Sequence, residues 1–291
     1  MKIEMLLGAI NNIETNDSGN PYEVIGNIYN ANEWGIDVLV GPEWSLTSKS
    51  GIYLKKHITQ NKAKNVLGDL FNAPDYNEYA PRDARKILEE KIDNESVFKK
   101  VPSIPYSKRE YEKLLNGLKA ASKGSDMLIF PGTAMFYDSN RILYNVMPIL
   151  RNGKVIKSIY KFNDGLGSDF NLEGELRLYP SETNYEGYRK GQYSLSYGED
   201  PIITFKDIKA SVEICADAGI LKEYGVNNLD LQILSSCGNS STQNVITSRG
   251  YMVSVDGFKD VDIKVLGKGL LKQRPIKKIH GMSIFNLDFD L

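Results

Sequence analysis

The segment Lys209–Ile220, KASVEICADAGI, constrains the fold of this chain of 291 residues more than any other stretch. Apolar side chains recur at every second position of Ile208–Ile214, which predicts a buried β-strand. Small residues, among them Ala216 and Gly219, then end the strand and leave Cys215 at its tip. Such a cysteine can serve as a nucleophile, because a substrate can approach the backbone beside it. It can also be a small hydrophobic residue of the core.

Composition and charge limit the class of protein. Hydrophobic residues make up 41% of the chain and charged residues 25%, which is typical of a globular protein with a substantial core. The length, with no repeat or linker in the sequence, predicts one domain over residues 1–291. A formal net charge of -1 provides no basic field, so we expect neither nucleic acid nor a membrane as a partner.

The N-terminal apolar stretch stops at Asn11, too short for a signal peptide, and no apolar run reaches transmembrane length. We therefore expect a cytoplasmic protein. In that setting the two cysteines, Cys215 and Cys237, do not indicate a disulfide framework, and Cys237 is expected to be a structural thiol. The two histidines, His57 and His280, have no metal-ligand spacing. We expect neither a metal nor another cofactor.

Short strands alternate with helices along most of the chain, which is the pattern of an α/β protein. Strands are predicted at residues 3–10, 36–40, 127–130, 134–137, 142–150, 155–160, 202–205, 208–214, 229–235, 252–255 and 282–289. Helices are predicted at residues 22–34, 107–123, 220–224 and 242–251. Two blocks interrupt this pattern: residues 51–106 are charge-rich and predict a helical insertion, and the glycine-rich residues 163–200 predict a long functional loop.

Three reactive residues each follow a predicted strand, namely Glu43, Lys161 and Cys215. Their residue types suit attack on the carbon of an amide or nitrile. Glu43 would accept the thiol proton and later deliver it to the leaving nitrogen. Lys161 and the backbone N–H of Ala216 would stabilise the negative charge of the tetrahedral intermediate. Trp44, beside the predicted base, would form a wall of the substrate pocket, although core packing is the commoner role of a tryptophan.

At these positions the sequence resembles the nitrilase, or carbon-nitrogen hydrolase, superfamily. The resemblance is carried by VLVGPE at 38–43, YN at 144–145, GK at 153–154, IYK at 159–161, VEICAD at 212–217 and SRG at 248–250. It implies a four-layer αββα sandwich and a Glu43–Lys161–Cys215 triad. The implied activity is hydrolysis of a non-peptide carbon–nitrogen bond in a small amide-type substrate through a cysteine thioester, with acyl transfer as a variant of the same chemistry. The resemblance also implies a homodimer.

The chain departs from the family pattern at several places. Ala216 follows the cysteine where many members carry an aromatic residue, which suggests an altered pocket. Many members carry a second glutamate between the lysine and the cysteine. Here Glu173 and Glu175 are preferred, because they follow the strand of Lys161 more closely than Glu182 and Glu186 do.

Other readings stay open from the sequence. The long insertions and Ala216 also fit a nitrilase-fold protein that binds a ligand or partner without turnover. A cysteine hydrolase that uses His57 or His280 as its base is a third option. Glu213 shares the alternation of Cys215, which predicts that it lines the site or pairs with a core cation. Arg249 is expected to be a buried ion-pair partner.

Overall fold

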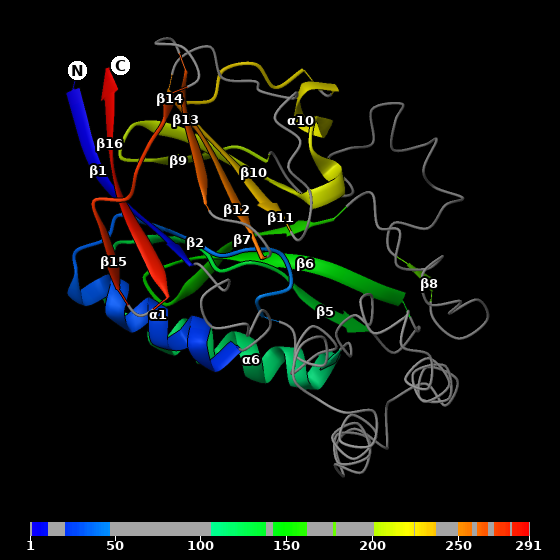
Figure 1. Cartoon of the computed structure of the whole chain (residues 1–291). Helices are drawn as coiled ribbons and strands as arrows, with labels where there is room; N and C mark the ends of the chain where they lie inside the picture. Colours follow the sequence, from blue (N-terminus) through cyan, green and yellow to red (C-terminus); the bar gives the residue numbers. More distant parts are fainter. Residues whose placement is uncertain are drawn as a thin grey trace, which may run out of the picture.

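The computed structural model describes residues 2–10, 21–46, 106–137, 142–161, 177–178, 201–223, 225–236, 250–257, 261–266, 271–279 and 281–290. Two β-sheets face each other in this part of the chain, and two long helices cover the far side of the first sheet (Figure 1). Among the described helices, none has the length and the apolar character needed to cross a membrane.

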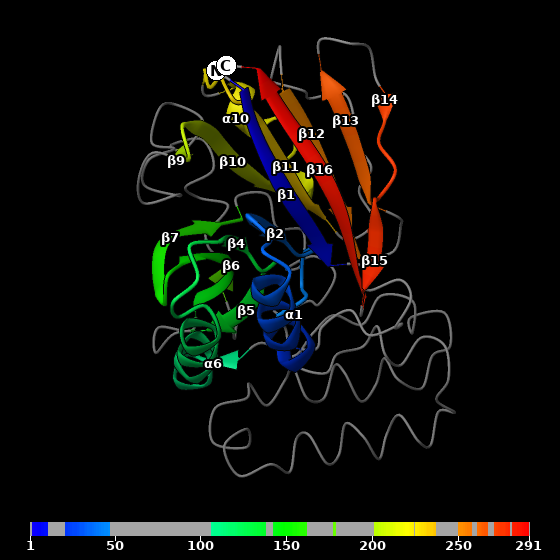
Figure 2. The same cartoon turned by 90° about the vertical axis from the view of Figure 1, so that its left-hand side faces the viewer.

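The first sheet contains ten of the described strands in mixed directions. Its main path runs β15-β16-β1-β2-β4-β6-β5-β3, and β7 and β8 also pair with β6. β1, β2 and β4 are parallel neighbours, whereas β16 runs antiparallel to β1 over its whole length, so the two ends of the chain lie together (Figure 2). The strands are β1 (Lys2–Ile10), β2 (Val38–Val40), β3 (Tyr106–Ser107), β4 (Leu128–Phe130), β5 (Ala134–Tyr137), β6 (Ile142–Arg151), β7 (Lys154–Tyr160), β8 (Arg177–Leu178), β15 (Lys277–Ile279) and β16 (Met282–Asp290).

The second sheet contains six of the described strands, in the order β14-β13-β12-β11-β10-β9. β10, β11 and β12 are parallel, and β9 and β13 join them antiparallel. The strands are β9 (Ile203–Phe205), β10 (Ile208–Ile214), β11 (Leu231–Ser236), β12 (Gly250–Asp256), β13 (Asp262–Leu266) and β14 (Leu271–Lys272).

Helices α1 (Pro21–Glu33) and α6 (Lys108–Ala121) lie side by side against the first sheet (Figure 2). Each buries one apolar stripe, as the helical spacing of its apolar residues predicts. Two short elements follow β10, the 3-10 helix η2 (Cys215–Asp217) and helix α10 (Ile220–Glu223).

Strand alternation divides the core into two clusters. One face of each sheet turns toward the other sheet, and side chains such as Leu7, Phe130 and Val212 fill the space between them. The opposite face of the first sheet packs against α1 and α6 through a separate cluster that includes Ile129. Leu234, on the outer face of the second sheet, is buried as well. Both faces of both sheets are therefore covered, as a four-layer α/β sandwich requires.

Most predicted elements are confirmed, with ends that differ by no more than two residues. Two hairpins of the described part have two-residue turns. Asn152 and Gly153 between β6 and β7, and Lys206 and Asp207 between β9 and β10, all have the positive φ that two-residue hairpin loops prefer.

Three boundaries are wrong. Tyr106, placed in the helical insertion, lies in β3 and pairs with Phe136. Within the predicted loop 163–200, the pair Arg177–Leu178 forms β8 beside β6. Tyr251, expected to end a helix, lies in β12, because its ring packs edge-on against Phe289 across the sandwich. Gly250 lies in β12 as well, and the remaining residues of the predicted insertion, loop and helix 242–251 lie outside the described part of the chain.

Two glycines fix the loops that follow β2 and β4. The Gly41 N–H donates to the carbonyl of Phe130 over 2.7 Å, and Ser45 Oγ donates to the carbonyl of Pro131 over 2.6 Å. Gly132 has a φ of +93°, and a Cβ there would lie 1.9 Å from Ser45 Oγ. A Cβ on Gly41 would lie 2.4 Å from the carbonyl oxygen of Pro131. Only glycine at both positions allows this approach of the two loops.

Replacing Gly132 by Ala is expected to lower the free energy of unfolding by about 2–5 kcal/mol, from strain at positive φ and from overpacking. Urea denaturation followed by circular dichroism measures the change. Gly26→Ala is the matched control, because its Cβ would meet nothing within 4 Å on α1. That change should stabilise the protein by up to about 1 kcal/mol. Equal stability of Gly132→Ala and the wild type would contradict the predicted clash.

Candidate active site

Glu43 lies just after β2 and is 1% exposed. Lys161 lies directly after β7 and is 5% exposed. The Lys161 Nζ donates to Glu43 Oε1 over 2.6 Å, so the structure brings together two charged residues that are 118 positions apart in the sequence. A cation and an anion buried at this depth require each other, because neither could be desolvated alone without a cost of several kcal/mol.

Asn145 completes this buried cluster. Asn145 lies in β6 opposite Lys161. The backbone N–H of Lys161 donates to the backbone carbonyl of Asn145 over 2.8 Å. Its side-chain Nδ2 donates to Glu43 Oε1 over 3.1 Å, and the residue is 2% exposed. Asn145 belongs to the YN motif at 144–145 that carries the family resemblance, but no role was assigned to it from the sequence. The available signal was its hairpin register, which places it beside Lys161.

The cluster retains two buried acceptors. Oε2 of Glu43 and Oδ1 of Asn145 each accept no hydrogen bond from any residue in the described ranges. Oε1 of Glu43, by contrast, receives two donors, Lys161 and Asn145. The carboxylate is thus held through one oxygen, and its other oxygen keeps the capacity to accept a proton or a hydrogen bond.

Cys215 begins η2 directly after β10, and its φ is +48°. Left-handed backbone is uncommon outside glycine and is found where a turn must aim a side chain. The turn is closed by the Ala218 N–H, which donates to the carbonyl of Cys215 over 3.1 Å. The cysteine side chain is partly buried and packs against the cluster between the two sheets.

A hydrogen bond between the sheets links the Cys215 turn to the Glu43 loop. Ile214, which precedes Cys215, pairs in register with Ser235 on β11. Ser235 Oγ donates to the carbonyl of Gly41 over 2.9 Å, two residues before Glu43. The ends of β2, β10 and β11 therefore meet at one edge of the sandwich. The Cys215 turn thus lies at the same edge as the loop that carries Glu43.

The expectation that Glu213 lines the site or pairs with a cation is wrong. Its neighbours Val212 and Ile214 belong to the cluster between the sheets, so Glu213 points to the outer face of the second sheet. The alternation stops at Ile214, because the positive φ of Cys215 turns that side chain back toward the inner cluster. The two residues consequently lie on opposite faces.

Glu213 instead accepts hydrogen bonds from neutral groups. Its Oε1 accepts from the Gly219 N–H over 2.8 Å and from the Leu221 N–H over 3.1 Å. Its Oε2 accepts from Gln232 Nε2 over 2.8 Å. Burial raises the pKa of the Glu213 carboxyl above its ordinary value of 4.5, and the hydrogen bonds from Gln232, Leu221 and Gly219 oppose that rise.

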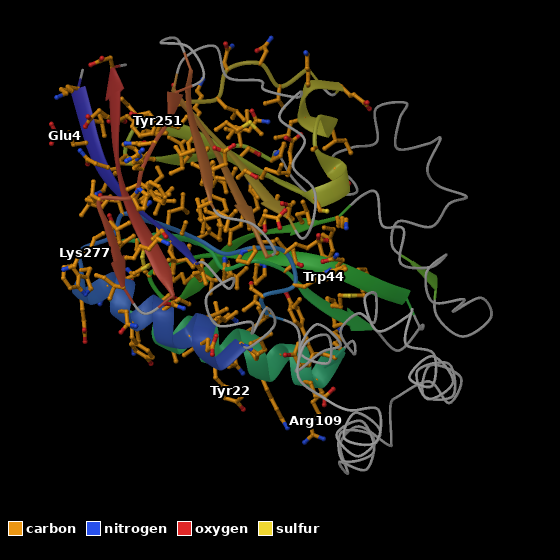
Figure 3. All side chains as sticks on the ribbon, viewed as in Figure 1. Glu4, Tyr22, Trp44, Arg109, Tyr251 and Lys277 are labelled. Atoms are coloured by element: carbon orange, nitrogen blue, oxygen red, sulfur yellow. The ribbon has the colours of Figure 1, made fainter. Side chains whose placement is uncertain are left out.

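Trp44 also has backbone of positive φ, at +65°, and is half-buried. The backbone N–H of Trp44 donates to Thr133 Oγ1 over 2.9 Å, which fixes the loop to the segment after β4. Figure 3 shows Trp44 at the level of the sheets, whereas Tyr22 and Arg109 point away from α1 and α6. This position beside Glu43 is compatible with a pocket wall, which stays a prediction.

The other predicted site residues are placed only in part. Ala216 lies in η2 next to Cys215. A set of further candidates lies outside the described residues: Glu173, Glu175, Glu182, Glu186, Cys237, Arg249, His57 and His280. Within the described ranges, no group of three or more His, Cys, Asp and Glu residues has a geometry that could hold a metal ion.

Breaking the buried pair from one side tests its energetics. Lys161→Met leaves the Glu43 carboxylate buried without its cation, which should lower the free energy of unfolding by about 3–5 kcal/mol. The double variant Glu43→Leu with Lys161→Met should recover much of that loss, because no uncompensated charge remains. Urea denaturation of the wild type, Lys161→Met, Glu43→Leu and the double variant gives the coupling energy. Simple additivity of the two single changes would show that the pair is not energetically coupled.

Glu213 predicts a specific pH dependence of stability. Its folded-state pKa is raised, so the folded protein holds this proton to higher pH than the unfolded chain does. The contribution is fully present below the ordinary carboxyl value of 4.5 and is lost as pH rises through the raised folded value. Glu213→Gln should flatten this part of the stability profile, as measured by urea denaturation at successive pH values. An unchanged profile would assign the dependence to another group.

Comparisons with known proteins agree with this architecture. No protein-family model matches the sequence, and no curated protein sequence matches it. Among solved structures, Nit3 of Saccharomyces cerevisiae, a member of branch 10 of the nitrilase superfamily, is similar with a TM-score of 0.52 and 14% identity, over 99% of this chain and 90% of that one. The glutamine-dependent NAD+ synthetase of Acinetobacter baumannii is similar with a TM-score of 0.51 and 14% identity, over 99% of this chain and 46% of that longer protein. The chain has the four-layer αββα fold of the nitrilase superfamily.

Proposed function

We propose that this protein hydrolyses a non-peptide carbon–nitrogen bond in a small amide-type substrate, with Cys215 as nucleophile, Glu43 as base and Lys161 as the oxyanion-stabilising cation. The observation that carries the proposal is the buried Lys161–Glu43 pair. It leaves Glu43 Oε2 as a buried acceptor in the loop that Ser235 ties to the end of the cysteine strand. An acid held in this way can take up and return a proton without moving.

The residues divide the reaction into two half-reactions. Glu43 Oε2 takes the proton of the Cys215 thiol as the sulfur attacks the substrate carbon. The negative charge that develops on the substrate oxygen is stabilised by the Lys161 ammonium and the Ala216 N–H. Glu43 returns the proton to the leaving nitrogen, and a thioester forms. Glu43 then takes a proton from the water that attacks the thioester and passes it to the departing sulfur, which regenerates the Cys215 thiol and the Glu43 carboxylate and releases the acid.

The unpartnered acceptors favour an amide over a nitrile. Glu43 Oε2 and Asn145 Oδ1 are both buried and both lack donors among the described residues. A buried acceptor without a donor costs about 1–3 kcal/mol, so the site gains from a substrate that brings N–H groups. An amide nitrogen carries such hydrogens and a nitrile nitrogen carries none. Discrimination through an otherwise unpaired buried group is the strongest kind that a small site can provide.

The fold supports the proposal without specifying it. The similarity to Nit3, a nitrilase-superfamily member, extends over nearly the whole chain, but a shared fold alone does not determine a reaction. The chemistry therefore rests on the buried cluster of this chain. Trp44 is proposed as a pocket wall, and Glu173 or Glu175 as a supporting second glutamate.

Ammonia release from a panel of small amides and the matching nitriles tests the proposal directly. We expect turnover of at least one amide and slower turnover of its nitrile. Cys215→Ala should lower kcat/KM by about 10⁴-fold or more, because the covalent path is lost. Cys237→Ala is the matched control and should keep wild-type activity.

Intact-mass spectrometry during turnover adds a second measurement. A transient mass increase equal to the acyl group should appear on the wild type and on Cys237→Ala, and it should be absent from Cys215→Ala. Tight binding of an amide with no ammonia release and no adduct would instead indicate a ligand-binding protein. Activity that survives Cys215→Ala would exclude the proposed nucleophile.

A further inference from the structure

Glu213 is a buried acid for which the proposed reaction has no use. It is 1% exposed and lies on the outer face of β10, on the opposite side of the strand from the cluster that Cys215 contacts. Burying a carboxyl group is unfavourable unless hydrogen bonds compensate it. Three of the hydrogen bonds that Glu213 accepts come from the N–H groups of Gly219 and Leu221 and from Gln232 Nε2. The position of these hydrogen-bond donors therefore indicates the structural role of Glu213.

The first two hydrogen bonds close a loop around the cysteine. Glu213 lies two residues before Cys215, and Gly219 lies four residues after it. The loop contains the positive φ of Cys215, at +48°, and that of Gly219, at +102°. A non-glycine residue in this region costs about 1–2 kcal/mol, so such a turn keeps one conformation only when surrounding bonds fix it. Glu213 Oε1 supplies two such bonds from a single atom.

The third hydrogen bond connects this loop to the neighbouring strand. Gln232 belongs to β11, the strand that also carries Ser235. Ser235 in turn donates to the carbonyl of Gly41 in the loop of Glu43. A continuous set of hydrogen bonds thus runs from the turn after Cys215, through Glu213 and Gln232, to the strand that contacts the proposed base's loop.

We propose that Glu213 is a positioning residue that holds the Cys215 turn in the conformation that aims the thiol at Glu43. The inference rests on the proposed role of Cys215 as nucleophile. Glu213 itself touches neither substrate nor the reacting atoms, because it lies on the other face of the strand. Its effect passes through the backbone of Cys215–Gly219. Misplacement of a reacting group by about 1 Å can cost about 100-fold in rate.

The rate of Cys215 alkylation by iodoacetamide tests the inference without any substrate. All proteins carry Cys237→Ala, so that a single thiol reacts. Glu213→Ala removes the acceptor, and Glu213→Asp draws it back by one methylene group. Glu213→Gln keeps an acceptor oxygen at the same reach for Gly219 and Leu221. Ser211→Ala is the matched control, because Ser211 lies on the same face of β10, is buried, and donates to the carbonyl of Pro201 over 2.9 Å.

We expect Glu213→Ala and Glu213→Asp to slow alkylation by about 10- to 100-fold at a temperature where circular dichroism shows them folded. Glu213→Gln should stay within about threefold of the wild type, since its oxygen can replace the carboxylate. Ser211→Ala should lower the melting temperature and leave the alkylation rate unchanged. If Glu213→Ala does not fold, the contrast between the Asp and Gln variants decides. Alkylation at the wild-type rate or faster in the folded Asp or Ala variant would overturn the inference.

Steady-state kinetics separate this inference from the proposed function. With an amide that is turned over, the same variants should lower kcat and leave KM within about twofold, because only the nucleophile is displaced. If no amide is hydrolysed but the alkylation contrast holds, the proposed function fails and the positioning role stands. If amides are hydrolysed and Glu213→Asp changes neither kcat nor alkylation, the positioning role fails and the proposed function stands.

Discussion

The ion pair between Lys161 and Glu43 sets the main constraint on this structure. Its side chains are 6% and 1% exposed, and removing two such charges from water costs several kcal/mol per ion. Only good geometry recovers that cost, so the fold must hold Nζ and Oε1 close together, here at 2.6 Å. β2 is held between β1 and β4, and β7 is held by its hairpin with β6. The contact of the loops at Gly41 and Gly132 serves the same end, because it leaves the Glu43 loop little room to shift.

The thiol comes from the other sheet, so its position relative to the ion pair depends on how the two sheets pack. Strand alternation makes this arrangement strict, since a slip of one residue would move every inward side chain of β10 to the outer face. The hydrogen bond from Ser235 to Gly41 adds a direct link between the end of the cysteine strand and the loop of Glu43. Apolar packing thus holds the two sheets together as layers, and this polar contact joins them at the edge where the proposed site lies.

Much of the fold followed from local patterns in the sequence. Alternating apolar runs predicted β1, β7 and β10, and helical spacing predicted α1 and α6. The Asn-Gly step at Asn152 and Gly153 is the residue pair that a two-residue hairpin turn favours. β13, β14 and β15 were not predicted, because their polar and basic residues obscure the alternation, and their pairing with the strands next to them in sequence outweighs this local pattern. For β8 and the first residues of β12, tertiary pairing likewise outweighed local preference.

The site was predictable to the extent that reactive residues follow strands. That rule located Glu43, Lys161 and Cys215, but it gave no role to Asn145, whose place depends on hairpin register. It also misplaced Glu213, because alternation was extended through a residue that breaks it. The positive φ of Cys215 cannot be read from a pattern of apolar residues, since it is set by the turn that follows.

The polar character of Glu213 follows from that turn. The face on which it lies is buried, and an apolar side chain there would fill the space as Leu234 does on β11. However, such a residue would leave the N–H groups of Gly219 and Leu221 without their acceptor, at about 1–3 kcal/mol for each buried group. The sharp change of direction at Cys215 brings these N–H groups toward the outer face. A strand that turns a thiol inward at its end in this way therefore needs an acceptor on its outward side.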